Sequence, residues 1–327
     1  MISLCRYSII GHMKRNDARQ CYDIPIYNRI YPFLLKRRSD SLVYHTFNLD
    51  VTETVKYIRA YNATKPEFRL KFFYVFCAAF MRMIVLRPEL NRFIASNRYW
   101  QRNELSMTFL VKEDFTDEAP ETSNPLTFKP EMTLMDYARV IDDYINNAKH
   151  VSENSNHTDD TIAFFMKFPV WFVALVVKVL GYMDKLGKAP SFLREADGLH
   201  TSVFISNLGS IGITGGSPHH HLYEWGTTSL FITLGAMERK REFDDDGKVI
   251  SSREFIQIGA TVDERITSGF YFIKSLKLLQ DLLNNPQELE KVPEIPRDTI
   301  TKKEYKAKVR EADRQRRLAK KQARKKS

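Results

Sequence analysis

The chain of 327 residues contains only three cysteines, Cys5, Cys21 and Cys77. An odd count at these spacings suits neither a disulfide framework nor a zinc site. We therefore expect free thiols, a reducing compartment and a cytoplasmic protein. The sequence also lacks a phosphate-binding glycine loop, a Ser-His-Asp elbow and a CxxC pair. It therefore shows no residues for the reactions that depend on these motifs.

No apolar run reaches the roughly 20 residues that a membrane-spanning helix needs. The best candidate, FPVWFVALVV at Phe168–Val177, lies between Lys167 and Lys178. We expect it to belong to a helix over residues 162–186, kinked at Pro169 and buried in a soluble core. A helix lying in the membrane interface is the alternative. No transmembrane segment is predicted.

The positive charge of the chain is concentrated at its C-terminus. The first 300 residues hold 37 basic and 37 acidic side chains, whereas Thr301–Ser327 holds 13 Lys/Arg and 3 Asp/Glu, which accounts for the net charge of +10. This tail has almost no apolar stripe, so we expect it to fray or to form a single solvated helix. It either solubilises the protein or makes weak contacts with nucleic acid or an anionic surface.

Hydrophobic periodicity predicts an α/β domain. Alternating apolar residues indicate strands at 42–51, 105–111, 201–209, 229–236 and 254–265, and Asp246-Gly247 is the predicted turn of a hairpin over 241–252. Helical spacing indicates helices at 52–63, 67–87, 134–148 and 266–286. Because strands and helices do not alternate as regular βαβ units, we expect two layers, with helices packed on a mixed or largely antiparallel sheet.

Three segments, in this order, resemble the catalytic domain of the 2-oxo acid dehydrogenase acyltransferases, which shares its fold with chloramphenicol acetyltransferase. The first is YNRIYPFLLKRRSDSLVYHTFNLDVT, in which an arginine precedes the first core strand. The second, TSVFISNLGSIG, is similar to the Ser-Asn-Leu-Gly strand and turn of that family. The third, ATVDERITSGFYFIKSLKLLQDLLNNPQEL, is similar to its terminal strand, Asp-His-Arg-x-x-Asp-Gly motif and closing helix. The resemblance covers residues 27–289 and implies a chloramphenicol-acetyltransferase-like fold.

The resemblance also implies a frame of catalytic residues. In the family a histidine activates a thiol, the thiol attacks a thioester, and a hydroxyl stabilises the oxyanion. Position by position, the hydroxyl falls on Ser206, the leading arginine on Arg29, the motif aspartate on Asp263 and the motif arginine on Arg265. The motif glycine is retained as Gly269.

The motif histidine is missing from this frame. Its position holds Glu264, and the second motif aspartate, part of an ion-pair network that supports the site, is replaced by Ser268. Glutamate is a much weaker base than histidine at neutral pH. Glu264 is therefore either a structural carboxylate paired with Arg29 or Arg265, or a base strengthened by burial. In both cases we expect Glu264 and Ser206 to lie at neighbouring strand ends and to line one cleft.

Three consecutive histidines, His219–His221, lie between the Ser206 strand and the next strand. Histidine is well matched to proton transfer near neutral pH, so His220 or His221 is a candidate for the missing base. Otherwise these are surface or hydrogen-bonded residues. We do not expect a metal site, because adjacent residues rarely converge on one ion and no spaced partner ligand is present. HHLYEWG also resembles the His-His-x-x-x-Asp-Gly signature of peptide-synthetase condensation domains, except that Trp225 replaces the aspartate.

These observations predict an N-terminal extension over 1–26, a chloramphenicol-acetyltransferase-like acyltransferase domain over 27–295 and a basic tail over 296–327. The expected function is transfer of an acyl group from a coenzyme A thioester to an unknown acceptor through a modified site, without a covalently bound cofactor. The resemblance implies a homotrimer with the active site at the subunit contact. The alternative is a non-catalytic relative that keeps the fold for assembly or ligand binding.

Overall fold

The computed structural model describes residues 14–112, 121–150, 167–191, 197–214 and 218–326. The strands are β1 (Ala18–Gln20), β2 (Leu42–Asp50), β3 (Arg92–Ala95), β4 (Arg98–Arg102), β5 (Leu105–Phe109), β6 (Val111–Lys112), β7 (Glu121–Thr122), β8 (Leu126–Phe128), β9 (Val203–Asn207), β10 (Leu230–Phe243) and β11 (Val249–Asp263). The α-helices are α1 (Tyr31–Leu34), α2 (Thr52–Ala63), α3 (Phe72–Leu86), α4 (Leu134–His150), α6 (Val170–Lys185), α8 (Gly269–Asn284) and α9 (Lys302–Lys326).

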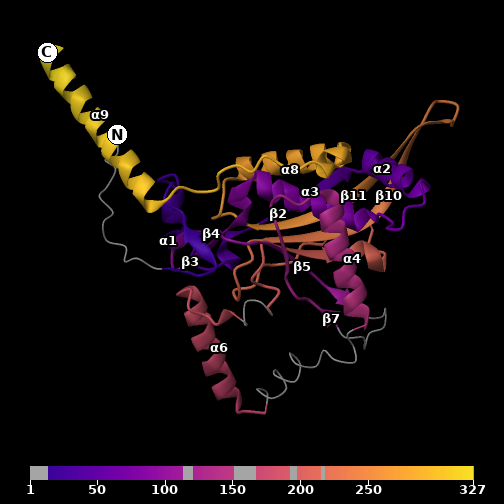
Figure 1. Ribbon diagram of the computed structural model, residues 1–327, viewed down its shortest axis with the longest axis horizontal. Coiled ribbons are helices and arrows are strands. Elements are labelled where there is room, and N and C mark those ends of the chain that lie inside the picture. The colour runs from indigo at the N-terminus through magenta and orange to yellow at the C-terminus, as the bar shows by residue number, and fades with distance from the viewer. Residues whose placement is uncertain (1–13, 113–120, 151–166, 192–196, 215–217, 327) are drawn as a thin grey trace.

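A six-stranded mixed sheet forms the centre of the molecule, with the strand order β2-β11-β10-β9-β5-β8 (Figure 1). Strand β11 is antiparallel to both β2 and β10, β9 runs parallel to both β10 and β5, and β8 is antiparallel to β5. A smaller sheet, β1-β4-β3, includes residues of the expected N-terminal extension, of which Cys21 and Ile24 are buried. The predicted mixed sheet is confirmed.

Helices α2, α3 and α8 lie along one face of the large sheet (Figure 1). Alternate strand residues, such as Ile205, Ile232 and Ile258, point to this face and are fully buried together with Phe80 and Leu279 from the helices. Because successive side chains of a strand point to opposite faces, the residues between them face away from the helices. This second face carries the candidate site.

Strands β10 and β11 continue past the sheet as a two-stranded arm (Figure 1). Its turn closes with two backbone hydrogen bonds, from Gly247 to Asp244 at 3.0 Å and from Asp244 to Lys248 at 2.9 Å. Gly247 has a φ of 79°, a left-handed conformation that glycine adopts without strain. The predicted Asp246-Gly247 turn is therefore confirmed.

The basic tail forms one helix, α9, which extends away from the body (Figure 1). Within the described residues, the contacts of α9 with the body come from its first turn. The Tyr305 hydroxyl accepts a hydrogen bond from Arg29 at 3.1 Å, and its ring stacks on Tyr22. The remainder of α9 is a solvated helix, which was one of the two expected states.

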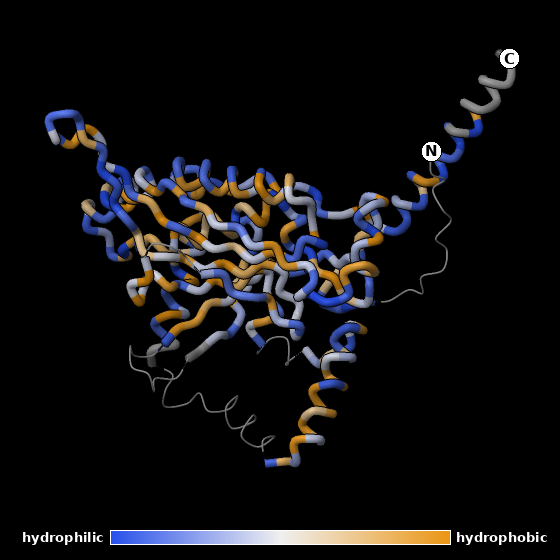
Figure 2. Tube along the Cα trace, turned by 180° about the vertical axis from the view of Figure 1, so that it is seen from behind, coloured by the Kyte–Doolittle hydropathy of each residue, from blue (hydrophilic) through white to orange (hydrophobic). Residues whose placement is uncertain are grey.

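The expected burial of the apolar helix near residue 170 is wrong. Its described part, α6, begins directly after Pro169, which caps the helix and does not kink it; residues 162–166 lie outside the described part of the chain. Val170 and Trp171 are 82% and 69% exposed, and Asp184 is the first buried residue of the helix. Figures 1 and 2 show α6 standing away from the sheet as a largely apolar rod. Within the described residues, no helix is long and apolar enough to span a bilayer.

Candidate active site

The sheet face opposite α2, α3 and α8 carries Ser206 in a row that crosses four strands. Ser206 of β9 is in register with Thr233 of β10, Thr233 with Gly259 of β11, and Gly259 with Thr46 of β2. Residues in register on neighbouring strands project to the same face. Ser206 is half-buried near the end of its strand, so its hydroxyl belongs to a partly sheltered surface.

A second, aromatic row lies two residues along the same strands. Phe204, Phe231, Thr261 and Tyr44 are in register with one another. Two residues of a strand span roughly 7 Å, which is the separation of the two rows. The rings of Phe204 and Phe231 stack with their centroids 4.7 Å apart and give this face an apolar floor beside Ser206.

The histidine loop lies across both rows. The Pro218 carbonyl accepts a hydrogen bond from the hydroxyl of Thr233, the register partner of Ser206. His219 Nε2 is 3.3 Å from the hydroxyl of Thr46, at the far end of the Ser206 row. The His220 ring stacks on Phe231 with centroids 4.1 Å apart. His220 therefore lies one row from Ser206, on the same face of the sheet.

The hydrogen bonding of His220 selects one tautomer of its neutral ring. Nδ1 is 2.7 Å from the carbonyl oxygen of His221. A carbonyl oxygen only accepts, so Nδ1 carries the proton and Nε2 keeps its lone pair. This is the arrangement that a general base requires. His221 is exposed and stacks on the other face of His220 with centroids 4.7 Å apart.

Arg38 holds the far end of the histidine loop and was missed in the sequence. Its guanidinium donates to the carbonyl oxygens of Tyr223 at 2.7 Å and Gly226 at 3.0 Å. Burial lowers the pKa of Arg38, and the nearby Asp263 carboxylate offsets this only in part. In the sequence, no pattern distinguishes the buried Arg38 from the exposed Arg37 beside it.

Trp225, which replaces the condensation-domain aspartate, belongs to a buried charged cluster. Its indole nitrogen donates to the carboxylate of Asp197, which is 3.1 Å from His200 Nδ1. His200 Nε2 is 3.4 Å from Asp184, and Asp184 is 3.2 Å from Arg15. Burial alone would lower the pKa of His200, but the two carboxylates outweigh burial and raise it. The cluster anchors the C-terminal end of α6 to the body.

The retained motif residues Asp263 and Arg265 form a buried ion pair. The carboxylate of Asp263 accepts two hydrogen bonds from Arg265, at 2.8 and 2.7 Å. Arg265 also donates to the Leu35 carbonyl at 2.8 Å and so joins the end of β11 to the segment that follows α1. Burial would lower the pKa of Arg265, but the Asp263 carboxylate raises it. The pair is a structural clamp at this strand end.

Glu264 lies between these two residues, but its side chain is exposed. Its backbone nitrogen donates to the Ser41 carbonyl at 2.9 Å. The expected ion pair with Arg29 or Arg265 is absent, because Arg265 is paired with Asp263 and Arg29 binds Ile24 and Tyr22 carbonyls and the Tyr305 hydroxyl.

The expectation that Glu264 and Ser206 line one cleft is wrong within a single protomer. Strand β10 separates their two strands, and the Ser206 row crosses β11 at Gly259. Glu264 is five residues further along, which corresponds to roughly 16 Å. The motif alignment could not reveal this offset, because the offset depends on the register of strands that are distant in sequence.

The last two motif positions lie at the start of α8. Ser268 is its N-cap, and its hydroxyl accepts from the Tyr271 backbone nitrogen at 3.2 Å. A side chain at Gly269 would meet no atom within 4 Å, so packing within the protomer does not explain the glycine. Both residues sit beside the Asp263–Arg265 clamp in the sequence, away from the Ser206 row.

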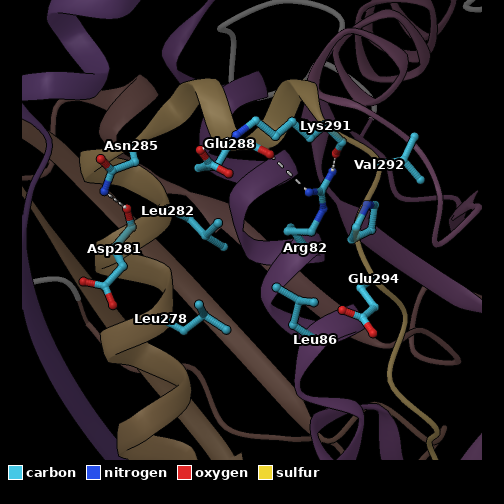
Figure 3. Close-up of a pocket in the computed structure, with 11 residues that line it drawn as sticks. Arg82, Leu86, Leu278, Asp281, Leu282, Asn285, Glu288, Lys291, Val292 and Glu294 are labelled. Atoms are coloured by element: carbon cyan, nitrogen blue, oxygen red, sulfur yellow. Dashed lines mark hydrogen bonds and ion pairs between the residues drawn. The ribbon is translucent and has the colours of Figure 1, made fainter.

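A separate groove opens on the helix-covered side of the molecule, between α3 and α8 (Figure 3). Arg82 projects into it and donates to the carbonyl oxygens of Lys291 at 2.8 Å and Met132 at 3.1 Å. The guanidinium thus fastens the chain after α8 onto α3. The groove lies on the opposite side of the sheet from Ser206 and the histidine loop.

No protein-family model and no curated protein matches the chain. Solved structures do match it. The cubic core of the pyruvate dehydrogenase multienzyme complex aligns over 88% of this chain and 98% of its own, with 15% identity and a TM-score of 0.52. The chain has the fold of this acyltransferase core. The dihydrolipoamide acetyltransferase of Azotobacter vinelandii gives the same four values. The probable dihydrolipoamide acetyltransferase of Listeria monocytogenes aligns over 81% of this chain and 94% of its own, with 15% identity and a TM-score of 0.51. The acyltransferase-like fold inferred from the three sequence segments is thereby confirmed.

Proposed function

We propose that this protein transfers an acyl group from a coenzyme A thioester to a nucleophilic acceptor, with His220 as the base and Ser206 as the oxyanion donor. One observation carries the proposal: the histidine loop crosses the Ser206 row, with His220 stacked on Phe231 and Pro218 bonded to Thr233. His220 would thus supply, beside Ser206, the base that the motif position lacks in this chain, where Glu264 replaces the histidine of the family. His221, exposed and stacked on His220, is the second candidate for this role.

The chemistry needs no further cofactor. Nε2 of His220 accepts the proton of the acceptor, and the acceptor attacks the thioester carbonyl carbon. The carbonyl oxygen becomes an oxyanion, to which the Ser206 hydroxyl donates a hydrogen bond. When the tetrahedral species collapses, the carbon–sulfur bond breaks, and the coenzyme A thiolate leaves with the proton held by His220.

We further propose a homotrimer. A row of exposed apolar side chains precedes and includes α1: Ile26, Tyr27, Ile30, Phe33 and Leu34. Arg265 joins this segment to the strand end next to Glu264. The exposed Phe270 follows in the first turn of α8. An apolar patch of this size on a protein surface favours a subunit contact. In such a contact, Glu264 and Gly269 of one protomer would face a neighbour and not their own Ser206.

A reducing, cytoplasmic setting agrees with the described cysteines. Cys21 and Cys77 are both buried and free. Burial raises the pKa of Cys21 to about 11 and that of Cys77 well above its ordinary value, so both remain protonated thiols. They are structural residues and do not compete with the histidine loop for the chemistry.

Release of free coenzyme A thiol from a panel of acyl-CoA thioesters tests the proposal. We expect turnover by the parent protein and a loss of about 100- to 10,000-fold in His220→Ala, the range that general-base catalysis supplies. Ser206→Ala should lose about 100- to 1,000-fold. His219→Ala is the matched control. It removes a histidine from the same loop, but this histidine contacts Thr46 and Tyr44. Turnover that depends on Glu264 and not on His220 or His221 would refute the relocated base.

A non-catalytic role in assembly or ligand binding is the second candidate. The observation that favours it is the loss of the motif histidine while Asp263 and Arg265 remain as a structural clamp. A folded parent that releases no thiol from any acyl-CoA, yet forms a stable trimer, would support this second function over acyl transfer.

A further inference from the structure

Helix α6 has an apolar surface that the rest of the described chain leaves uncovered. From Val170 to Met183 its only charged residue is Lys178. Five of its large apolar residues other than Val170 are about half exposed or more: Trp171, Leu175, Val177, Val179 and Tyr182. A helix that is apolar on nearly every side is ordinarily buried in a core or in lipid. Among the residues that the structure describes, none covers this surface of α6, so it is available to an occupant.

The helix is fixed at one end only. Asp184, at its C-terminal end, is buried against Arg15 and His200, and Gly181 approaches the ring of Trp225. The opposite end, with Trp171 beside Phe168 and Phe172, points away from the body (Figure 1). The anchored end sets the orientation of the helix, and the free end presents three aromatic rings.

The exposed charges on α6 and directly beside it in the described chain are positive. Lys167, Lys178, Lys185 and Lys188 are exposed, and none of them forms an ion pair with a residue that the structure describes. The single acidic residue, Asp184, is neutralised in the buried cluster. Lys178 and Lys185 are seven residues apart and so lie on the same side of the helix. A surface that covers α6 must therefore be apolar and carry negative charge at its edge.

We propose that α6 docks on an anionic phospholipid bilayer and lies in the plane of its interface. Sixteen helical residues span roughly 24 Å, less than the roughly 30 Å of a hydrocarbon core, so the helix is too short to cross it. Aromatic rings favour the interface, and lysines at the ends and on one side reach the phosphates. Symmetric pairing of α6 with α6 of a second copy would instead bring like charges together, which disfavours that occupant.

Vesicle binding by the full chain tests this surface. We expect the parent to sediment with vesicles of phosphatidylcholine and phosphatidylglycerol, to bind more weakly to phosphatidylcholine alone, and to be released by salt. Brominated acyl chains should quench part of its tryptophan fluorescence, and Trp171→Phe should remove that quenching. Leu175→Glu with Val179→Glu should weaken binding about tenfold or more, because two apolar side chains no longer enter the interface.

Two controls separate α6 from other parts of the chain. Val249→Glu with Ile250→Glu places the same two charges at exposed apolar residues of the β10–β11 arm and should bind as the parent does. Truncation after Tyr305 removes most of the basic tail and should retain the quenching by brominated lipid. Binding that is lost on truncation but unaffected by the α6 substitutions would overturn the proposal in favour of the tail. Absence of vesicle binding, with an oligomer that dissociates in the α6 variant, would overturn it in favour of a second copy.

Discussion

Helices α3 and α6 have nearly equal lengths and similar apolar compositions, yet they occupy opposite environments. Every residue of α3 from Tyr74 to Val85 is buried, including Arg82, whose guanidinium donates hydrogen bonds to backbone carbonyls. In α6 only Asp184 is buried. The difference arises because α3 lies between the sheet, α4 and α8, whereas the described residues leave most of α6 uncovered. Apolar composition therefore does not distinguish a core helix from an interaction helix.

The largest effect should come from matched truncations in these two helices. Phe80→Ala in α3 should destabilise the protein by about 3–5 kcal/mol, because it leaves a cavity in the core. Trp171→Ala in α6 should change the free energy of unfolding by less than about 0.5 kcal/mol, since the ring is exposed. Chemical denaturation followed by circular dichroism measures both. Equal losses in the two variants would abolish the contrast between the helices.

Charged pairs provide a second test of buried against exposed positions. Asp263→Asn leaves Arg265 buried without its partner and should destabilise by about 3–5 kcal/mol. The exposed pair of Lys56 and Glu53 is the matched control, and Lys56→Gln should cost about 0–1 kcal/mol. Both are read from denaturation midpoints at neutral pH. A mild Asp263 variant would mean that the clamp at the end of β11 is dispensable.

The anchored end of α6 should make stability depend on pH. The raised pKa of His200 means that its stabilising charge is present below about pH 6.5 and is lost as the pH rises through the folded-state pKa. Burial would raise the pKa values of Asp184 and Asp197, but their hydrogen bonds and positively charged neighbours, His200 foremost, together lower them; their contribution is lost as the pH falls below about 4. Arg15, which pairs with both Asp17 and Asp184, completes the cluster.

Thermal melts across this range check the prediction. The melting temperature of the parent should fall between pH 6 and pH 8. That of His200→Gln should fall much less, because glutamine is a polar side chain of similar size that does not titrate. A parallel decline in both proteins would assign the pH dependence to other groups.

The smallest effect should come from the tail. Truncation after Tyr305 removes a solvated helix and should shift the melting temperature by no more than about 2 °C. Truncation before Thr301 also removes the Tyr305 contacts with Arg29 and Tyr22 and should shift it further. Scanning calorimetry of the two truncations compares the free part of α9 with its tied first turn. A large fall in melting temperature on truncation after Tyr305 would show that α9 packs on the body.

Much of the fold could be predicted because its signals are local. Alternation in residues 42–51 and 254–265, the Asp246-Gly247 pair and the apolar run of α3 each specify an element within a few residues. The three segments that resemble the acyltransferases also lie on the central sheet and its closing helix. The candidate site was less accessible, because Arg38 and Phe231 have no local signature. Arg38 binds Tyr223, which is 185 residues away, and Phe231 pairs with Phe204 on another strand.

The sequence alone therefore determined where the long strands and helices lie, which faces of the strands are apolar and where the net charge lies, because these follow from neighbouring residues. Only the tertiary structure decided which of two apolar helices is covered, and that His220, not Glu264, lies within one row of Ser206. The physical reason is the same in both cases. Strand register and helix packing bring together residues that are distant in the chain, whereas periodicity shows only on which face of its own strand or helix a residue lies.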